Sequence, residues 1–369
     1  MKTIVKDLGS KKPNYPIKNL AKLEEILFLD IETTGFTAQN SNLYLIGCAY
    51  YKENEWHTIQ WLAENYDEET VVLQAFLEFC LGYTFLIHFN GNRFDIPYLQ
   101  QKCKMYDIPF MFEVYQGVDL YKRIKPYKSF LKLNDLKQKT LEQFLGIERD
   151  DKFSGGELIN YYHDYVCSHS EELMNAILLH NQEDVEGMLD LTAILAFSDL
   201  FNLPLRVMKV QANYYNDYEN KKRQELVLNL RFMTPLPVPV SYASMGCYFT
   251  GNELNGIIKV PLYEEEMKYF YSNYRDYYYL PEEDIAIHKS VASFVDKDHR
   301  EQATAANCYT RKQASYLPQW EMLFTPFYKR GYRERDMFFE LTDEFKTSRA
   351  SFNQYAEHIL QTMLMSDFV

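Results

Sequence analysis

The sequence lacks the features that would place it in a membrane or a secretory pathway. It has no uninterrupted apolar run of the roughly 18 to 20 residues that a membrane-spanning helix needs. Residues 1–20 are rich in lysine but contain no apolar core of a secretion signal. We therefore expect a soluble, cytoplasmic protein with no membrane partner.

Paired cysteines are also missing. The six cysteines stand singly at positions 48, 80, 103, 167, 247 and 308, without the C-x-x-C spacing that zinc and redox sites prefer. Most have apolar or aromatic neighbours, which predicts reduced, buried thiols and agrees with a cytoplasmic location.

An excess of positive charge is absent as well, since the formal net charge is −13. Such acidity argues against a nucleic-acid partner, because phosphate attracts a basic surface. The charge is unevenly spread, however: residues 24–202 carry −16 and the remainder carries +3. Within the acidic part, residues 122–139 contain seven basic side chains and one acidic side chain. A nucleic-acid partner is therefore not excluded.

The chain is long enough, at 369 residues, for one large or two medium domains. We expect a basic N-terminal extension at 1–23, an α/β domain at 24–202 and an accessory region at 203–369 that begins near Pro204. In the accessory region, residues 203–262 read as β-rich, with Pro235, Pro237 and Pro239 in a stiff connection. Residues 263–369 read as mainly helical.

The α/β domain contains a strand that ends in two carboxylates. Residues 26–29 form an apolar run, and Asp30 and Glu32 follow at a spacing of two, so they share one face of the strand. Strand patterns at 42–51, 55–61 and 83–90, with a helical pattern at 68–81, predict a mixed sheet with packed helices. An isolated D-x-E often only caps a turn, so its interpretation depends on partners elsewhere in the chain.

Further carboxylates follow two later elements. Asp95 comes after the strand at 83–90 and the turn at Gly91, where it either caps a helix or joins a site. His180 and Asp184 are four residues apart on a long helical stretch, which places them on one face about 6 Å apart along the axis. Apolar neighbours indicate that this face is partly buried, and a buried carboxylate needs a partner.

The four carboxylates together predict metal binding. Each close pair costs about 1 to 4 kcal/mol at surface-like dielectric, and several pairs would rival a total stability of roughly 5–15 kcal/mol. Hard oxygen ligands suit Mg²⁺ or Mn²⁺, and two such ions about 3.5–4 Å apart can clamp a phosphodiester. We therefore expect Asp30, Glu32, Asp95 and Asp184 to be metal ligands.

These motifs resemble the DnaQ-like, or DEDD, superfamily of 3′–5′ exonucleases, which has an RNase H-like fold. The resemblance covers residues 24–202 and rests on residues 29–35, 90–99 and 181–185. Residues 145–147, Ser154-Gly155 and Tyr161-Tyr162 are most similar to the bacterial YprB-like branch. The resemblance implies an α/β fold with a mixed sheet flanked by helices, followed here by the β-rich and then helical C-terminal region.

The resemblance also implies roles for individual residues. Asp30, Glu32 and Asp184 would hold one ion beside the attacking water, Asp30 would bridge to a second ion, and Asp95 would assist directly or through water. The superfamily's general base is a tyrosine four residues, or a histidine five residues, before the last aspartate. His180 combines the first spacing with the second side chain, and imidazole can accept a proton near pH ~6.5. Thr33, Asn90 and Phe94, within the motifs, are candidate substrate contacts.

A second basic stretch lies near the C-terminus. Lys329, Arg330, Arg333 and Arg335 alternate with aromatic residues, a composition that can follow a phosphate backbone and stack bases. A solvated basic face beside core aromatics explains the stretch equally well.

Three functions remain open from the sequence. The first is a two-metal 3′–5′ exonuclease acting on single-stranded RNA or DNA. The second is a structure-selective endonuclease on the same fold, and the third is a binding module for nucleic acid or protein with little or no catalysis. Intact carboxylates favour an enzyme.

Overall fold

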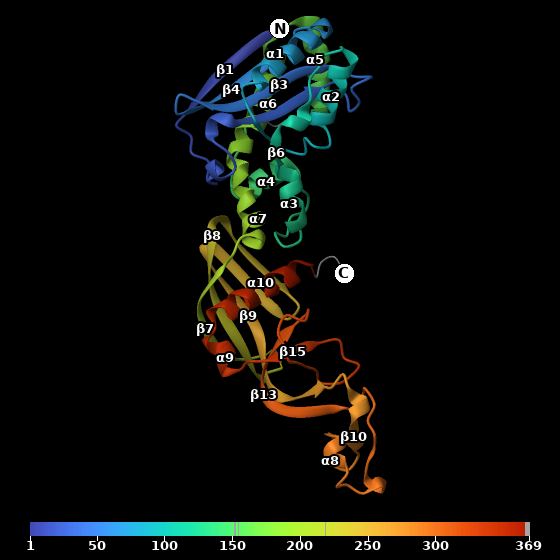
Figure 1. The fold of residues 1–369 in the computed structure, drawn as a ribbon. Coiled ribbons are helices and arrows are strands. Elements are labelled where there is room, and N and C mark those ends of the chain that lie inside the picture. The colour runs from blue at the N-terminus through green and yellow to red at the C-terminus, as the bar shows by residue number, and fades with distance from the viewer. Residues whose placement is uncertain (151–152, 154, 218, 366–369) are drawn as a thin grey trace. The chain divides into compact units, whose positions relative to one another are not determined.

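The computed structural model describes residues 1–150, 153, 155–217 and 219–365, so Ser154 lies outside the described residues (Figure 1). The chain divides into two units. The N-terminal unit comprises Met1–Asp199 and Leu236–Val238, and the C-terminal unit comprises Leu200–Pro235 and Pro239–Val369. No helix in the described part of the chain combines the length and the apolar character needed to span a bilayer.

A six-stranded mixed sheet forms the centre of the N-terminal unit, in the order β1-β4-β3-β2-β5-β6. The strands are β1 (Lys2–Gly9), β2 (Ile26–Thr33), β3 (Leu43–Lys52), β4 (Glu55–Leu62), β5 (Phe85–His88) and β6 (Gln116–Asp119). β2 pairs antiparallel with β3 and parallel with β5, which makes it a central strand. The predicted α/β fold, a mixed sheet flanked by helices, is confirmed.

The expected basic extension at 1–23 instead supplies an edge strand of this sheet. β1 pairs antiparallel with β4, from Lys2 opposite Leu62 to Gly9 opposite Trp56. Most β1 side chains are exposed or half-buried. An edge strand of this kind has no buried alternation to mark it, and lysines typically protect such edges.

Some helices pack against the sheet and others lie beyond its end (Figure 1). They are α1 (Glu69–Cys80), α2 (Asp95–Met105), α3 (Leu120–Ile124), α4 (Gln138–Leu145), α5 (Gly155–Ser168), α6 (Glu171–Leu191) and α7 (Leu195–Asn202). α1 agrees with the helix predicted at 68–81, and its inward residues Val72 and Phe76 are fully buried. A 3-10 turn at Thr192–Ile194 separates α6 from α7. α6 packs against β2, β3 and β4.

The core explains why β2 is central. All four apolar residues before Asp30 are completely buried, as are most residues of β3. Burying a large apolar side chain stabilises the fold by about 1.5–3 kcal/mol, so the apolar run holds β2 inside the sheet. Asp30 and Glu32, which follow the apolar run, are therefore positioned at the C-terminal end of the strand.

The C-terminal unit is built on a second six-stranded sheet, in the order β14-β15-β13-β9-β8-β7. Its strands are β7 (Arg206–Asn216), β8 (Lys222–Ser244), β9 (Cys247–Phe270), β13 (Tyr309–Gln319), β14 (Phe327–Tyr328) and β15 (Met337–Glu340). A small sheet contains β10 (Tyr277–Leu280), β11 (Ile285–His288) and β12 (Glu301–Gln302). The helices are α8 (Lys289–Ala292), α9 (Asp343–Thr347) and α10 (Arg349–Met365).

Two expectations for this unit were wrong. Residues 263–340 are mostly strand and loop, and α9 and α10 supply the terminal helices. Long-range pairing of β13 with β9, from Tyr309 opposite Phe270 to Tyr316 opposite Tyr263, decides the structure here, and local periodicity does not reveal it. The three prolines lie inside β8, beyond the stretch Lys222–Arg231 that pairs with β7. Their alternate spacing turns all three missing N–H groups to one edge of the strand.

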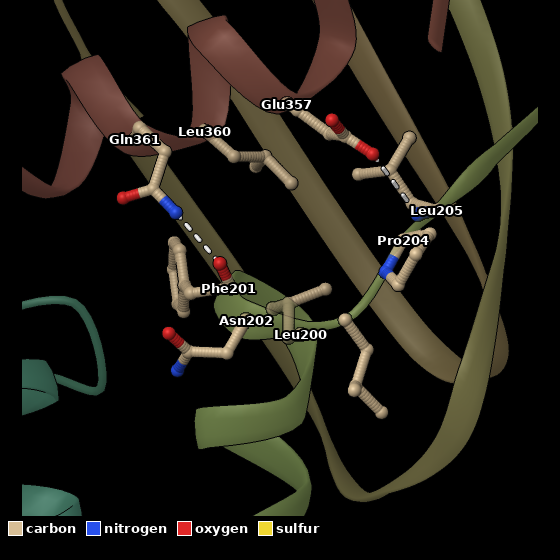
Figure 2. Close-up of a pocket in the computed structure, with 9 residues that line it drawn as sticks. Leu200, Phe201, Asn202, Pro204, Leu205, Glu357, Leu360 and Gln361 are labelled. Atoms are coloured by element: carbon tan, nitrogen blue, oxygen red, sulfur yellow. Dashed lines mark hydrogen bonds between the residues drawn. The ribbon is translucent and has the colours of Figure 1, made fainter. Parts of the chain in front are cut away.

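α10 is tied to the segment that leads into β7 (Figure 2). The Gln361 side chain donates to the Phe201 carbonyl over 2.6 Å, and the Leu205 N–H donates to Glu357 over 3.4 Å. The cavity between them is lined mainly by apolar side chains, including Leu200 and Leu360.

Candidate metal centre

Asp30 and Glu32 lie at the end of β2, as predicted. Both are half-buried, whereas Ile31 between them is buried on the other face. The pairing of β2 with β3 shifts register between Glu32 and Thr33, which marks the end of regular strand. The Thr33 hydroxyl donates to the Gly35 carbonyl over 2.8 Å and helps to shape the turn that follows.

The turn from β5 to α2 is organised by Asp119, a residue that the motifs did not identify. Its carboxylate accepts the N–H groups of Asn90 at 2.9 Å and Asn92 at 3.2 Å. Gly91 is needed between them, because a Cβ at that position would lie 2.6 Å from the His88 ring. The role of Asn90 seen here is therefore to shape the turn.

Asp95 is the first residue of α2 and is buried. The Ile31 N–H donates to its Oδ1 over 3.3 Å, which joins α2 to the carboxylate strand. Burial raises the pKa of Asp95 to about 7, against the effect of backbone hydrogen bonds and with a contribution from the charges of Asp119 and Asp184. Asp95 is therefore part of the carboxylate cluster and does more than cap a helix.

The third segment of the site comes from α6 through Asn181, which lies in the third motif and to which the motif assigns no role. Its side-chain amide donates to Asp30 Oδ2 over 2.9 Å and accepts from Gln60 over 2.9 Å. Gly47 on β3 leaves the space for it, since a Cβ there would lie 2.0 Å from Asn181 Oδ1. Asn181 thus orients Asp30.

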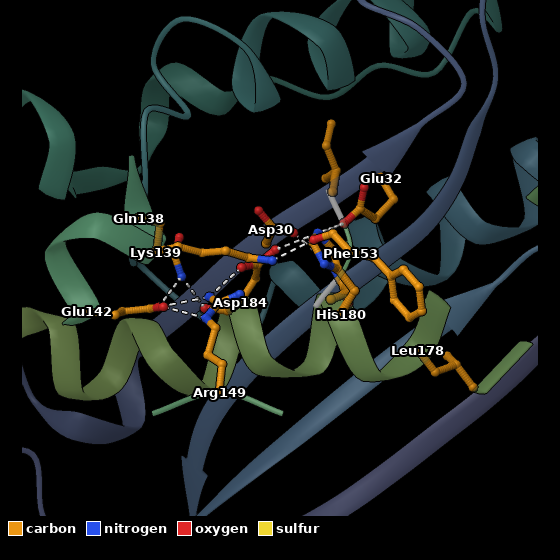
Figure 3. A network of polar contacts seen from close by, with 12 residues as sticks. Asp30, Glu32, Gln138, Lys139, Glu142, Arg149, Phe153, Leu178, His180 and Asp184 are labelled. Carbon is orange, nitrogen blue, oxygen red and sulfur yellow. Dashed lines mark hydrogen bonds and ion pairs between the residues drawn. The ribbon is translucent and has the colours of Figure 1, made fainter. Parts of the chain in front are cut away.

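His180 and Asp184 lie on the same side of α6, facing Glu32 (Figure 3). His180 Nε2 is 3.3 Å from Asp184 Oδ2 and 3.6 Å from Glu32 Oε1. One ligand atom from each of the three residues lies within 4.8 Å of the other two. The imidazole and both carboxylates therefore converge on one point.

Arg149 approaches the same site from the loop after α4, and the motifs gave no sign of it. Its Nη2 donates to Asp184 Oδ1 over 2.5 Å and to Glu142 Oε1 over 2.8 Å, while Nε donates to the other Glu142 oxygen. Glu142 is buried, and the Gln138 amide also donates to it over 2.9 Å. Although burial opposes it, pairing with Glu142 and Asp184 raises the pKa of Arg149.

The electrostatics of the cluster test whether it suits a cation. Burial, followed by the charges of Asp184, Glu32 and Asp95, raises the pKa of Asp30 well above its ordinary value, and only the Asn181 hydrogen bond opposes this. Carboxylates that repel one another in this way are stabilised by a positive ion between them. Oxygen ligands with one imidazole nitrogen form a donor set for divalent metal ions. The residues therefore fit a divalent ion.

Phe94, a predicted substrate contact, lies just before α2 and is half-exposed. Its ring meets that of Phe36 edge to face, with centroids 6.2 Å apart, and Phe36 is 88% exposed. The predicted contact thus has an aromatic neighbour that sequence reasoning missed, since Phe36 follows the first motif directly.

The predicted basic contacts belong to the C-terminal unit, in the segment around β14. Arg330 pairs with Glu265 over 2.6 Å and covers the Tyr263 and Phe338 rings, so it has a structural role. The Lys329 amine donates to the Glu334 carbonyl over 2.8 Å. Arg333 and Arg335 are exposed.

The mixed sheet, with a carboxylate pair at the end of its central strand and further carboxylates from two helices, defines an α/β domain of the RNase H-like class. Residues 27–196 match a family model, RNase_H_2, which is described as RNase_H superfamily. Residues 27–196 therefore form an RNase H superfamily domain.

Solved structures that the chain matches include a family B DNA polymerase from the hyperthermophilic archaeon Pyrobaculum calidifontis, at 16% identity and a TM-score of 0.39. Another is the zinc-bound form of an E. coli ExoI–ssDNA complex, at 12% identity and a TM-score of 0.28. The matches cover 47% and 57% of this chain, and 25% and 55% of the other chains. No curated protein sequence matches the chain.

Proposed function

We propose that this protein is a metal-dependent nuclease of the DEDD type that shortens single-stranded nucleic acid from its 3′ end. The observation that carries the proposal is that β2, α2 and α6 bring Asp30, Glu32, Asp95 and Asp184 into one cluster, in which burial and then the charges of the other three carboxylates raise the pKa of Asp30. The motif pattern further favours the YprB-like branch of the superfamily.

The four carboxylates would hold two divalent ions, Mg²⁺ or Mn²⁺, in our proposal. Such ions stabilise the attacking and leaving oxygens of a phosphodiester displacement. Side chains of the protein hold two of these carboxylates in fixed orientations. Asn181 fixes one Asp30 oxygen, and Arg149 fixes one Asp184 oxygen, so each carboxylate presents its other oxygen to the cluster.

A single-stranded substrate suits the aromatic residues beside the cluster. The exposed ring of Phe36 and the partly exposed ring of Phe94 offer surface on which an unpaired base can stack, and such stacking contributes about 1–3 kcal/mol per base. Bases in a duplex are already stacked on each other. We therefore assign Phe36 and Phe94 to binding of the terminal nucleotides.

The test uses RNA and DNA oligonucleotides labelled at the 5′ end, incubated with the protein and Mg²⁺ or Mn²⁺. We expect a ladder that shortens by one nucleotide at a time, and no ladder with Asp30→Asn. Asp7→Asn, which changes an exposed carboxylate of β1, is the matched control and should keep the wild-type rate. Internal cuts would identify an endonuclease instead, and retention without cleavage would identify a binding module.

A further inference from the structure

His180 lies at a ligand position of the metal centre. We propose that His180 Nε2 is itself a metal ligand, together with Glu32 and Asp184, and that this mixed site prefers a transition-metal ion such as Mn²⁺ or Co²⁺ to Mg²⁺. The inference rests on the proposed metal-dependent nuclease. It makes His180 a metal ligand in place of the general base that the resemblance implies.

The distances between the three donor atoms favour a shared ion. An ion bound at about 2.1 Å keeps neighbouring ligand atoms about 3.0 Å apart in octahedral geometry and about 3.4 Å apart in tetrahedral geometry. The His180 nitrogen is 3.3 Å from the Asp184 oxygen and 3.6 Å from the Glu32 oxygen. The first separation lies between these two values, the second is slightly longer, and all three donor atoms lie within 4.8 Å of one another.

The same distances disfavour a general base. A base takes its proton from a water that occupies a ligand position, so it lies a further hydrogen-bond length of about 2.6–3.2 Å behind that position. His180 Nε2 lies beside the carboxylate oxygens, so it occupies a ligand position and not a position one hydrogen bond behind it. A nitrogen that coordinates the ion has no lone pair left to accept a proton.

The fold holds this arrangement firmly. His180 and Asp184 are one helical turn apart on α6, and both the imidazole and the neighbouring Asn181 are buried. Arg149 occupies Asp184 Oδ1, which leaves Oδ2 as the oxygen that faces His180. The three donors therefore come as a preformed set, two from one helix and one from β2.

An imidazole in the donor set changes metal preference. Mg²⁺ favours oxygen ligands and retains waters, whereas nitrogen ligands suit transition metals and raise affinity along the series from Mn²⁺ to Cu²⁺. Loss of a partner behind a metal ligand already weakens binding by about 10–100-fold. Loss of the ligand itself should weaken Mn²⁺ binding by at least about 10-fold.

The experiment measures metal binding without nucleic acid. Calorimetric titration of the chelator-treated protein with Mn²⁺ and with Mg²⁺ gives both affinities. Electron–nuclear double resonance of bound Mn²⁺ then reports whether an imidazole nitrogen is coordinated. We expect such a signal in the wild type and its loss in His180→Ala, with Mn²⁺ affinity lowered at least 10-fold and Mg²⁺ affinity lowered much less.

Two further variants keep the test decisive. His180→Gln has a similar shape and offers an oxygen, so it should fold and also lose the nitrogen signal while reducing the preference for Mn²⁺. His57→Ala changes the histidine of the second cluster with metal-ligand spacing, formed with Asp7 and Glu55, and should keep the signal. A signal that disappears in His57→Ala but persists in both His180 variants would overturn the inference.

The outcomes separate this inference from the proposed function. If the wild type binds ions without nitrogen coordination and its oligonucleotide ladder is intact, His180 is not a ligand but the nuclease stands. If the wild type binds neither ion and cleaves nothing, the proposed function fails and the ligand inference fails with it.

Discussion

Arg149 and Asp184 are 35 positions apart in sequence, yet the guanidinium of the first donates to one carboxylate oxygen of the second over 2.5 Å. The same guanidinium group bonds both oxygens of buried Glu142. Arg149 is thus shared between the buried carboxylate of Glu142 and a carboxylate of the candidate metal centre, and its removal affects both.

We predict that Arg149→Ala lowers the stability of the metal-free protein by about 3–5 kcal/mol, because it leaves Glu142 buried without its charged partner. Replacing both partners, as in Arg149→Met with Glu142→Leu, should restore much of that loss, since apolar side chains of similar volume need no counter-charge. Urea denaturation in EDTA measures both effects. If Arg149→Ala is as stable as the wild type, the Arg149–Glu142 pair makes no net contribution to the free energy of unfolding.

A second prediction concerns Gly47, which has no side chain of its own to contribute. Gly47→Ala places a Cβ where Asn181 Oδ1 now lies, so Asn181 must move and Asp30 loses its hydrogen bond. We expect cleavage to fall about 10–100-fold, the usual cost of losing a residue that orients a metal ligand. Initial rates on a labelled oligonucleotide measure it.

The control for Gly47→Ala is Gly156→Ala, in the first turn of α5, where an added Cβ meets nothing within 4 Å. This variant should retain the wild-type rate. Equal losses in both variants would mean that any added methyl group disturbs the unit and that the Asn181 contact has no special part.

A third prediction concerns pH. Burial raises the pKa of Asp95 to about 7 from an ordinary 3.8, so the folded protein holds this proton more tightly than the unfolded chain. The resulting stability is complete below about pH 4 and is lost as the pH rises through about 7. The metal-free protein should therefore be less stable at pH 8 than at pH 5, and Asp95→Asn should flatten this slope.

Urea denaturation in EDTA from pH 5 to pH 8 measures the effect. Asp135→Asn is the control, because a hydrogen bond from Thr140 lowers the pKa of Asp135 and places its contribution below this window. It should keep the wild-type slope. A wild-type protein that gains stability from pH 5 to pH 8 would contradict the clustered-charge argument.

A fourth prediction divides the C-terminal basic residues by their surroundings. Exposed Arg333 and Arg335 are available for phosphate, so replacing both with serine should make the salt dependence of single-strand binding shallower by about 1.4, or about 0.7 per lost contact. Arg330→Ala should instead lower stability, because it breaks the pair with Glu265. Filter binding across a salt series, with thermal melts, distinguishes them; an unchanged slope would assign both arginines to a solvated face.

The sequence predicted those parts of the site that lie on strongly patterned elements. The apolar run of β2 and the two-residue spacing after it were sufficient to place Asp30 and Glu32 on one face of the strand. The four-residue spacing was sufficient to place His180 and Asp184 on one face of the helix. The residues that orient them were missed because they act across the fold: Asn181 reaches Asp30 over 151 positions. Gly47 was missed for a related reason: its role is to leave room for the Asn181 side chain, and no sequence pattern indicates that requirement.

One local sequence feature does indicate the contact between Arg149 and Glu142. Gly146 ends α4 in the left-handed region, with φ of 75°, and turns the chain back so that Arg149 meets Glu142 seven residues earlier. A helix-ending glycine flanked by opposite charges is a reasonable signal for such a pair. Nothing local, by contrast, predicts that this pair adjoins Asp184, or that residues 263–340 pair as strands with β9.

One feature of α6 bears on how the protein is made. His180, Asn181 and Asp184 all belong to this helix, while Asp30, Glu32 and Asp95 are encoded long before it. During synthesis, the earlier carboxylates are present before the residues that orient and complete them. A growing chain therefore carries no assembled carboxylate cluster until α6 has emerged and packed against β2.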